Sequence, residues 1–183
     1  MARVLIPLAQ GCEELEAVTI IDLLRRAKIE VITAGLQEGP VTASHGTVLV
    51  PDTTLDNVLD QQFDLLVLPG GIPGADNLNQ DPRIHNLLKK MVANGKYTAA
   101  ICAAPKVLAD AGLLDGRNAT CYPGVLDTFS QINLTQDAVV TDNKIITSRG
   151  PGTAMDFALT LIEVLLGSAM HKTIETQLQR NNN

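Results

Sequence analysis

The beginning of the chain holds two short apolar runs on either side of an amphipathic stretch. Residues 4–8 (VLIPL) and 29–33 (IEVIT) are predicted to be strands, because each is short, largely apolar and bounded by turn residues. Between them, apolar side chains recur at helical spacing through about residue 27, while Asp22, Arg25 and Arg26 fall largely on the other side. A strand–helix–strand unit requires parallel strands and a right-handed crossover. This unit therefore directs the chain toward a parallel α/β sheet.

The same alternation of strands and helices continues along the chain. Strands are expected at residues 65–68 and 98–101, helices at 82–94 and 103–111, and a long helix up to about residue 165, followed by a short one from Ser168. Hairpins are expected over residues 41–51 and around Asp142 and Asn143. This pattern predicts the α/β class, with a mainly parallel sheet and helices on both faces.

Length and composition agree with one globular unit. The chain has 183 residues, 45% of them hydrophobic, but only 3% are aromatic and none is Trp, so the core must be aliphatic. No internal repeat or linker interrupts it, which predicts a single domain over residues 1–183. The closing residues 181–183 (NNN) are expected to form a frayed polar tail.

Net charge narrows the classes of binding partner, and cysteine usage indicates the cellular compartment. The net charge is −6 and no basic face is visible, so we expect no direct nucleic-acid binding. Three cysteines leave at least one thiol unpaired, which favours a reduced, cytoplasmic setting. The N-terminal apolar run is too short for a signal peptide, and no segment approaches the length of a membrane span.

Residues 99–105 (AAICAAP) place Cys102 where a predicted strand runs straight into a predicted helix. Ala100 and Ala104, two positions to either side, are small, as at a nucleophile elbow, where a sharp turn presents the reactive side chain. The start of a helix would also lower the pKa of the thiol from about 8.5. The alternative is an inert core thiol, because free Cys is among the most buried residue types.

Three carboxyl side chains, those of Glu13, Glu14 and Glu16, lie near the expected start of the first helix. Carboxylates in a first turn usually complement the helix dipole, and this interpretation fits Glu13 and Glu14. Glu16 lies about one turn inside, where it can face the same sheet edge as Cys102. We expect this pair to share one proton, with a protonated Glu16 donating to an anionic sulfur, which raises the glutamate pKa and lowers the cysteine pKa.

Residues 69–74 (PGGIPG) follow another apolar strand and reach the same edge. Their glycines can form a nest of N–H groups for an oxyanion, although a simple turn explains them equally well. No phosphate-binding glycine motif is present. The histidines His45, His85 and His171 lie in separate predicted elements, and no H-E-x-x-H or C-x-x-C spacing occurs, so we expect neither a metal site nor a cofactor.

Taken together, five motifs in the same order resemble the ThiJ/PfpI superfamily, and specifically its Parkinsonism-associated deglycase (DJ-one) branch. The resemblance covers nearly the whole chain. Its carriers are residues 11–18 (GCEELEAV), Asp22 with 25–27 (RRA), 67–71 (VLPGG), 99–105 (AAICAAP) and 147–153 (TSRGPGT).

This resemblance implies a flavodoxin-like three-layer sandwich with a mainly parallel central sheet, similar to class I glutamine amidotransferases, and usually a homodimer. It implies that Cys102 is the nucleophile, Glu16 its hydrogen-bonded partner, and Gly71 with Ala103 the backbone donors facing the bound oxygen. The activities it implies need no cofactor. They are conversion of methylglyoxal or glyoxal to the hydroxy acid and release of early glycation adducts, so the partners would be small reactive aldehydes or glycated proteins.

The sequence departs from this family pattern at two places. Tyr122 stands where animal members carry a histidine near the nucleophile, so Glu16 would have to move the protons. His45 stands where some members hold an arginine that crosses the dimer interface. The peptidase branch has histidine directly after its cysteine, and Ala103 at this position argues against proteolysis. Further pocket residues are expected to be Gly70, Tyr122, Pro151 and His45.

Two functions therefore remain open at the level of sequence. One is a cysteine-dependent enzyme acting on α-oxoaldehydes. The other is a redox sensor or chaperone in which Cys102 is oxidised to the sulfinate and not turned over, in which case Glu16 would cap the oxidised sulfur. A resolving role for Cys12 and a binding protein with a vestigial site are further alternatives.

Overall fold

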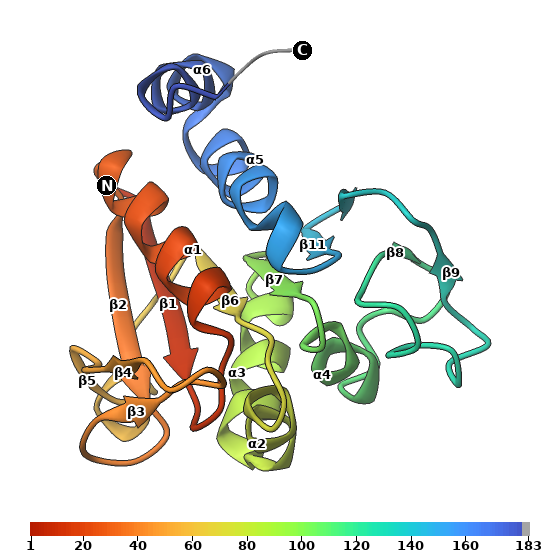
Figure 1. Cartoon of the computed structure of the whole chain (residues 1–183). Coiled ribbons are helices and arrows are strands. Elements are labelled where there is room, and N and C mark those ends of the chain that lie inside the picture. Colours follow the sequence, from red (N-terminus) through yellow and green to blue (C-terminus); the bar gives the residue numbers. More distant parts are fainter. Residues whose placement is uncertain (181–183) are drawn as a thin grey trace.

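A seven-stranded sheet forms the centre of the molecule (Figure 1). The structure is a computed structural model that describes residues 1–180, so the tail expected at 181–183 lies outside the described residues. The strands are β1 (Arg3–Leu8), β2 (Glu30–Gly35), β5 (Thr53–Thr54), β6 (Leu65–Leu68), β7 (Tyr97–Ile101), β10 (Val139–Asp142) and β11 (Ile145–Ser148). Their order is β10-β11-β7-β6-β1-β2-β5, and all neighbours are parallel except β10 and β11.

Helices cover both faces of this sheet (Figure 1). On one face α1 packs against α5, which in turn carries α6; on the other, α2 packs against α3 and α4, and α3 and α4 contact the sheet. The helices are α1 (Glu14–Arg26), α2 (Gly74–Gln80), α3 (Pro82–Ala93), α4 (Pro105–Asp110), α5 (Ala154–Leu166) and α6 (Ser168–Gln177), with 3-10 turns at η1 (Leu55–Val58) and η2 (Pro151–Thr153).

Two small sheets lie outside the central one. Strands β3 (Val41–Thr42) and β4 (Val48–Leu49) form the hairpin predicted over residues 41–51. Strands β8 (Asn118–Ala119) and β9 (Asn133–Leu134) pair in parallel and were not expected from the sequence. The β3–β4 hairpin matters for the site, because its turn lies against the first residues of α1.

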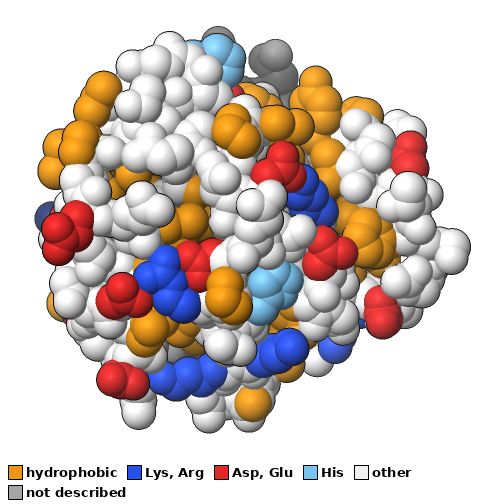
Figure 2. Space-filling view, turned by 90° about the horizontal axis from the view of Figure 1, so that it is seen from below, with side chains coloured by type: hydrophobic (Ala, Val, Ile, Leu, Met, Phe, Trp, Pro, Cys, Tyr) orange, Lys and Arg blue, Asp and Glu red, His pale blue; other side chains and the backbone are white. Residues whose placement is uncertain are grey.

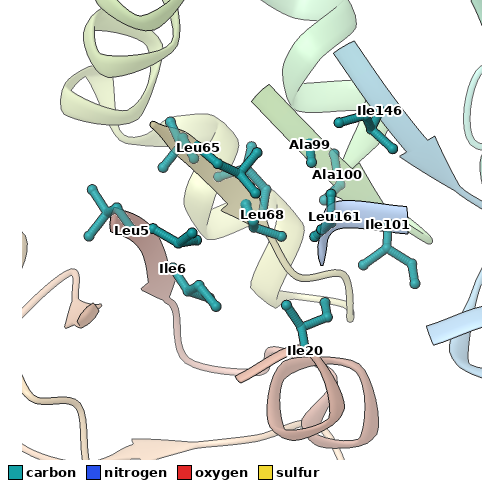
Figure 3. Close-up of a cluster of buried hydrophobic side chains, with 14 of the residues drawn as sticks. Leu5, Ile6, Ile20, Leu65, Leu68, Ala99, Ala100, Ile101, Ile146 and Leu161 are labelled. Atoms are coloured by element: carbon teal, nitrogen blue, oxygen red, sulfur yellow. The ribbon is translucent and has the colours of Figure 1, made fainter. Parts of the chain in front are cut away.

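The core is largely aliphatic, as predicted from the scarcity of aromatic residues, although it also contains Phe63 and Phe157. All four residues of β6 are buried, because helices cover both faces of the sheet at this strand. Figure 3 shows how Ile20 of α1 and Leu161 of α5 lie over Leu68 and Ile101 at the strand ends. Burying a side chain of this size stabilises the fold by about 1.5–3 kcal/mol, so this contact fixes α1 firmly on the sheet.

The predicted fold class is confirmed, with a mostly parallel central sheet in a three-layer α/β architecture. Two helices differ from expectation. The helix predicted from residue 103 begins only at Pro105 and spans six residues, and α2 was not predicted, because its sequence GADNLNQ is rich in poor helix formers. Among residues 1–180, no helix combines the length and the apolar character needed to span a membrane.

Strands β1, β6 and β7 are adjacent and parallel, so the segments that follow them meet at one edge of the sheet. Those segments contain Glu16, Gly70 with Gly71, and Cys102. Figure 2 views the molecule from the side on which β1 ends and shows acidic, basic and apolar side chains lying close together there. This edge carries the candidate site.

Candidate active site

Cys102 directly follows β7 and adopts a left-handed backbone conformation, with φ of 63°. A residue other than glycine in this region costs about 1–3 kcal/mol, so the surrounding structure has to hold it. The Cys102 N–H donates to the Ser148 carbonyl at 3.0 Å, and its own carbonyl accepts from the Tyr122 N–H at 2.9 Å. Together these contacts fix the sulfur at the sheet edge, where Cys102 stays 9% exposed.

Glu16 points inward from the first turn of α1 and is fully buried. Its Oε2 accepts a hydrogen bond from the Gly70 N–H at 2.9 Å, whereas Oε1 has no hydrogen-bond partner among the described residues. The Cys102 thiol is close enough to influence the Glu16 pKa, and the carboxyl influences that of the thiol in turn. The structure therefore brings Glu16 and Cys102 together.

The two glycines after β6 leave room for this approach. A Cβ on Gly70 would lie 2.6 Å from the Cys102 Cβ and 2.7 Å from the Glu16 Oε2. Gly71 has φ of 94°, and a Cβ there would lie 2.4 Å from the Glu13 backbone nitrogen. A side chain at either position would displace the residues of the site. The two glycines are therefore needed for steric reasons as well as for forming the turn.

Burial dominates the ionisation of the pair. It raises the pKa of Glu16 to about 7, against the opposing hydrogen bond from Gly70. Burial, followed by the nearby Glu16 charge, raises the pKa of Cys102 to about 12. The lowering of the Cys102 pKa that we expected from a helix start is therefore wrong. Between about pH 7 and about pH 12 the two groups hold one proton and one negative charge.

Two backbone N–H groups face the sulfur, those of Gly71 and Ala103, and each favours the anionic form of Cys102. They come from different segments, the turn after β6 and the elbow itself. The helix that follows begins three residues after Cys102 and is only six residues long. Charge stabilisation at the sulfur thus comes from these two groups and not from a helix dipole.

Tyr122 and Pro151 lie on one side of the elbow. They line a cavity of about 330 Å³ together with Arg149 and Thr153. The Tyr122 side chain is 52% exposed, while its backbone is tied to Cys102. A larger cavity of about 520 Å³ lies beside the ends of β1 and β2, and neither Cys102 nor Glu16 lines it.

His45 is not beside the sulfur but on the turn of the β3–β4 hairpin, with its side chain 73% exposed. Its Nδ1 lies 3.3 Å from carboxylate oxygens of both Glu13 and Glu14. Sequence reasoning missed this cluster, because its members are 31 residues apart and match no local motif. Cys12 is fully buried, and burial raises its pKa to about 11, which does not favour a resolving role.

These features define the class of the protein: a three-layer α/β domain with a cysteine on a strained strand end and a buried carboxyl beside it. Residues 2–164 match the DJ-1/PfpI family, and the chain belongs to this family.

Similar proteins with known names support the assignment to this family. Protein DJ-1 homologs B and A from Arabidopsis thaliana are each 44% identical over 168 residues, which is 90% of this chain but only 38% and 43% of their own lengths. The glutathione-independent glyoxalase DJR-1.2 from Caenorhabditis elegans is 39% identical, with 91% of this chain and 89% of that protein covered. The structure of oxidized Toxoplasma gondii DJ-1 superposes with a TM-score of 0.94 at 41% identity, covering 97% of this chain and 98% of that one.

Proposed function

We propose that this protein converts α-oxoaldehydes to hydroxy acids without a cofactor, with Cys102 as nucleophile and Glu16 as proton carrier. The observation that carries the proposal is the Cys102 sulfur, held on a left-handed strand end beside the buried Glu16 carboxyl and the N–H groups of Gly71 and Ala103. A glyoxalase among the relatives supports the same chemistry. Release of early glycation adducts from proteins would use the same attack on a carbonyl-derived carbon.

The first step forms a bond between the Cys102 sulfur and the aldehyde carbon of methylglyoxal. The carbonyl oxygen gains the electron pair, and the N–H groups of Gly71 and Ala103 stabilise the developing charge. Glu16 donates the shared proton to this oxygen, which gives a hemithioacetal and leaves a carboxylate. Because the pKa of Cys102 lies above that of Glu16, the shared proton starts on the sulfur; the Glu16 carboxylate removes it as the sulfur attacks and then returns it to the oxygen.

The second step moves hydrogen between neighbouring carbons. The Glu16 carboxylate removes the proton from the former aldehyde carbon, and the resulting enediol takes a proton back at the adjacent carbon, which gives a lactoyl thioester. Water then attacks the thioester and releases lactate, and the sulfur leaves with its electron pair. The balance is methylglyoxal plus water to lactic acid, without an external oxidant or reductant.

Replacement of Cys102 by Ser tests the proposal. We expect lactate formation from methylglyoxal to fall to background, since a serine hydroxyl in this position has no comparable anionic form. Cys121→Ser is the control, because Cys121 is also a free thiol, is more exposed than Cys102 and lies outside the pair. Lactate production by Cys102→Ser at more than half the wild-type rate would refute the proposal.

A second candidate function is redox sensing at the same sulfur. Its support is that Gly71, Ala103 and Glu16 surround Cys102 with groups able to hold sulfinate oxygens. After mild peroxide treatment, mass spectrometry should find Cys102 oxidised faster than Cys12 and Cys121. Equal rates at the three cysteines would exclude this function.

We further infer that two copies associate through the surface around α1. Leu15 and Val18 are about half exposed there, and Val48 of the neighbouring hairpin and Met155 of α5 are exposed as well. Large apolar side chains gathered on one surface favour contact with another protein. The three free thiols support action in a reducing compartment such as the cytoplasm.

A further inference from the structure

Thr147 opens the TSRGPGT motif (residues 147–153) and lies on β11, with its side chain buried. Its Oγ1 accepts a hydrogen bond of 3.0 Å from the backbone N–H of Thr120, which is buried as well. The bond joins two segments that lie 27 residues apart in the chain. Both segments lead directly to backbone groups that bind Cys102.

These two segments hold both polar backbone groups of Cys102. Ser148, which follows Thr147, accepts the Cys102 N–H through its carbonyl at 3.0 Å. Tyr122, two residues after Thr120, donates its N–H to the Cys102 carbonyl at 2.9 Å. The hydrogen bond between Thr147 and Thr120 therefore closes a ring of contacts around the backbone of Cys102. A residue other than glycine with φ of 63° persists only where its surroundings over-determine its conformation.

The strand just before residues 120–122 is not part of the central sheet. This strand, β8, pairs with β9 (Figure 1). Side chains from two strands of the central sheet hold the segment. Asp142 on β10 accepts the Asn118 N–H at 2.9 Å, and Thr147 on β11 provides the contact that is nearer in the chain to Tyr122. The position of the Tyr122 N–H therefore depends on the Thr147 side chain.

We propose that the Thr147 hydroxyl is a positioning group for Cys102. By holding residues 120–122 against β11, it keeps Cys102 in its left-handed conformation, with the sulfur beside Glu16. The effect of Thr147 on lactate formation rests on the proposed function, whereas its effect on the Cys102 thiol does not.

Loss of this hydroxyl has a defined consequence. The Thr120 N–H is then buried without an acceptor, and a buried unpaired donor carries its full desolvation cost. Residues 120–122 shift to pair this N–H elsewhere, and the Tyr122 N–H moves with them. Cys102 thereby loses one of the two bonds that hold its backbone and relaxes toward a more common conformation, which takes the sulfur away from Glu16.

Thr147→Val tests this role, because valine has nearly the shape of threonine but no hydroxyl. The first measurement is the pH dependence of Cys102 alkylation by iodoacetamide, followed by mass spectrometry. A thiol released from Glu16 and from the backbone donors should titrate near the ordinary value of about 8.5, so we expect the midpoint to move toward that value by more than about one pH unit. The second is lactate formation from methylglyoxal, in which kcat should fall by about 10–100-fold with little change in KM, because the reacting atom is misplaced.

Three controls make the result specific. Thr147→Ser restores the hydroxyl and should return both measurements close to the wild-type values. Thr98→Val is the matched control, because Thr98 is also buried in the sheet but its Oγ1 has no hydrogen-bond partner among the described residues, so both measurements should match the wild type. Cys12 is fully buried and reports on unfolding, and its alkylation should stay slow in every variant.

Hydrogen exchange of the wild-type chain tests the same ring of contacts without a variant, and it decides the question if Thr147→Val does not fold. The amides of Thr120, Tyr122 and Cys102 should open as one cooperative unit, so their protection factors should agree within about threefold. Exchange of the Thr120 or Tyr122 amide more than about tenfold faster than that of Cys102 would show that the contacts open independently, against the proposal.

Two further results would overturn the proposal. They are an unchanged alkylation midpoint for Cys102 in folded Thr147→Val, and a loss of kcat that Thr147→Ser does not reverse. If the wild-type chain forms no lactate, the proposed function fails, whereas the alkylation midpoint still decides the role of Thr147.

Discussion

The Glu16 carboxyl and the Cys102 side chain approach each other across the space that a side chain on Gly70 would fill. The Gly70 N–H donates to Glu16 at 2.9 Å, and the space that a Cβ would fill separates the carboxylate oxygen from the Cys102 Cβ. Gly70 therefore holds the Glu16 carboxyl through its N–H group and, having no side chain, leaves room for the Cys102 side chain. This relationship explains why an apolar strand, a glycine turn and an elbow have to converge for the site to exist.

Gly70→Ala should disrupt the site directly, because the added methyl group would lie between Glu16 and Cys102. The added methyl group would lie under 3 Å from three neighbours, one of them the Ile101 carbonyl, so the backbone has to shift. We expect a loss of about 1–3 kcal/mol in stability and turnover of methylglyoxal at background level. Gly152→Ala is the control for stability, because a Cβ there meets nothing within 4 Å. Thermal unfolding of Gly70→Ala at the wild-type temperature would contradict the steric argument.

The rate of methylglyoxal conversion should depend on pH through the shared proton. Below about pH 7 the pair holds both protons and carries no charge, so there is neither a thiolate nor a carboxylate. As the pH rises through about 7, one proton leaves and the reactive state forms. We expect kcat/KM to increase with an apparent pKa near 7, and a profile that is flat between pH 5 and pH 9 would contradict it.

Glu16→Gln should preserve the fold and remove the proton carrier. The glutamine amide oxygen can still accept the Gly70 N–H, but the side chain can no longer take up or release a proton at neutral pH. Loss of a general acid–base group lowers kcat by about 10²–10⁴-fold. Steady-state kinetics with methylglyoxal would measure this, and a decrease of less than threefold would assign proton transfer to another group.

Asp52 should stabilise the fold at neutral pH and lose this effect in acid. Burial opposes its ionisation, but hydrogen bonds from Thr33 and the Arg25 guanidinium outweigh this and lower its pKa. A lowered folded-state pKa stabilises the protein above the unfolded value of about 3.9, and this contribution is lost as pH falls through the folded value.

Asp52→Asn should therefore destabilise the protein at pH 7 by about 0.5–1.5 kcal/mol, because the hydrogen bonds from Thr33 add to an ion pair that solvent screens, and by less at pH 3. Asp22→Asn is the control, because Asp22 forms only an exposed pair with Arg26, worth a few tenths of a kcal/mol. Denaturant unfolding at the two pH values distinguishes them, and equal losses for both variants would show that Asp52 has no special role.

Leu15→Glu should prevent association of two copies. A charge placed in an apolar contact surface is strongly unfavourable when that surface is buried. Val92→Glu is the matched control, since Val92 is similarly exposed but lies on α3, in the opposite helix layer. We expect sedimentation to find a dimer for the wild type and Val92→Glu, and a monomer for Leu15→Glu. Identical behaviour of the two variants would place any interface elsewhere.

The sequence allowed most of the sheet to be predicted, because strands such as β6 are continuous apolar runs between clear turn residues. The convergence of Glu16, Gly70 and Cys102 also followed from parallel topology alone. The pKa of Cys102 could not be predicted, since it depends on how far the sulfur is buried and on which carboxyl atoms face it. The position of His45 could not be predicted either, because it depends on how the β3–β4 hairpin folds back onto α1.

The left-handed conformation at Cys102 restricts which nucleophiles evolution can place on this scaffold. Branching at Cβ is strongly disfavoured at φ of 63°, so threonine fits this position poorly although its hydroxyl is chemically suited to covalent catalysis. Of the two hydroxyl side chains, serine fits this backbone conformation better than threonine. The turn thereby preserves the identity of the reacting atom through backbone geometry, even where selection on the reaction itself is weak.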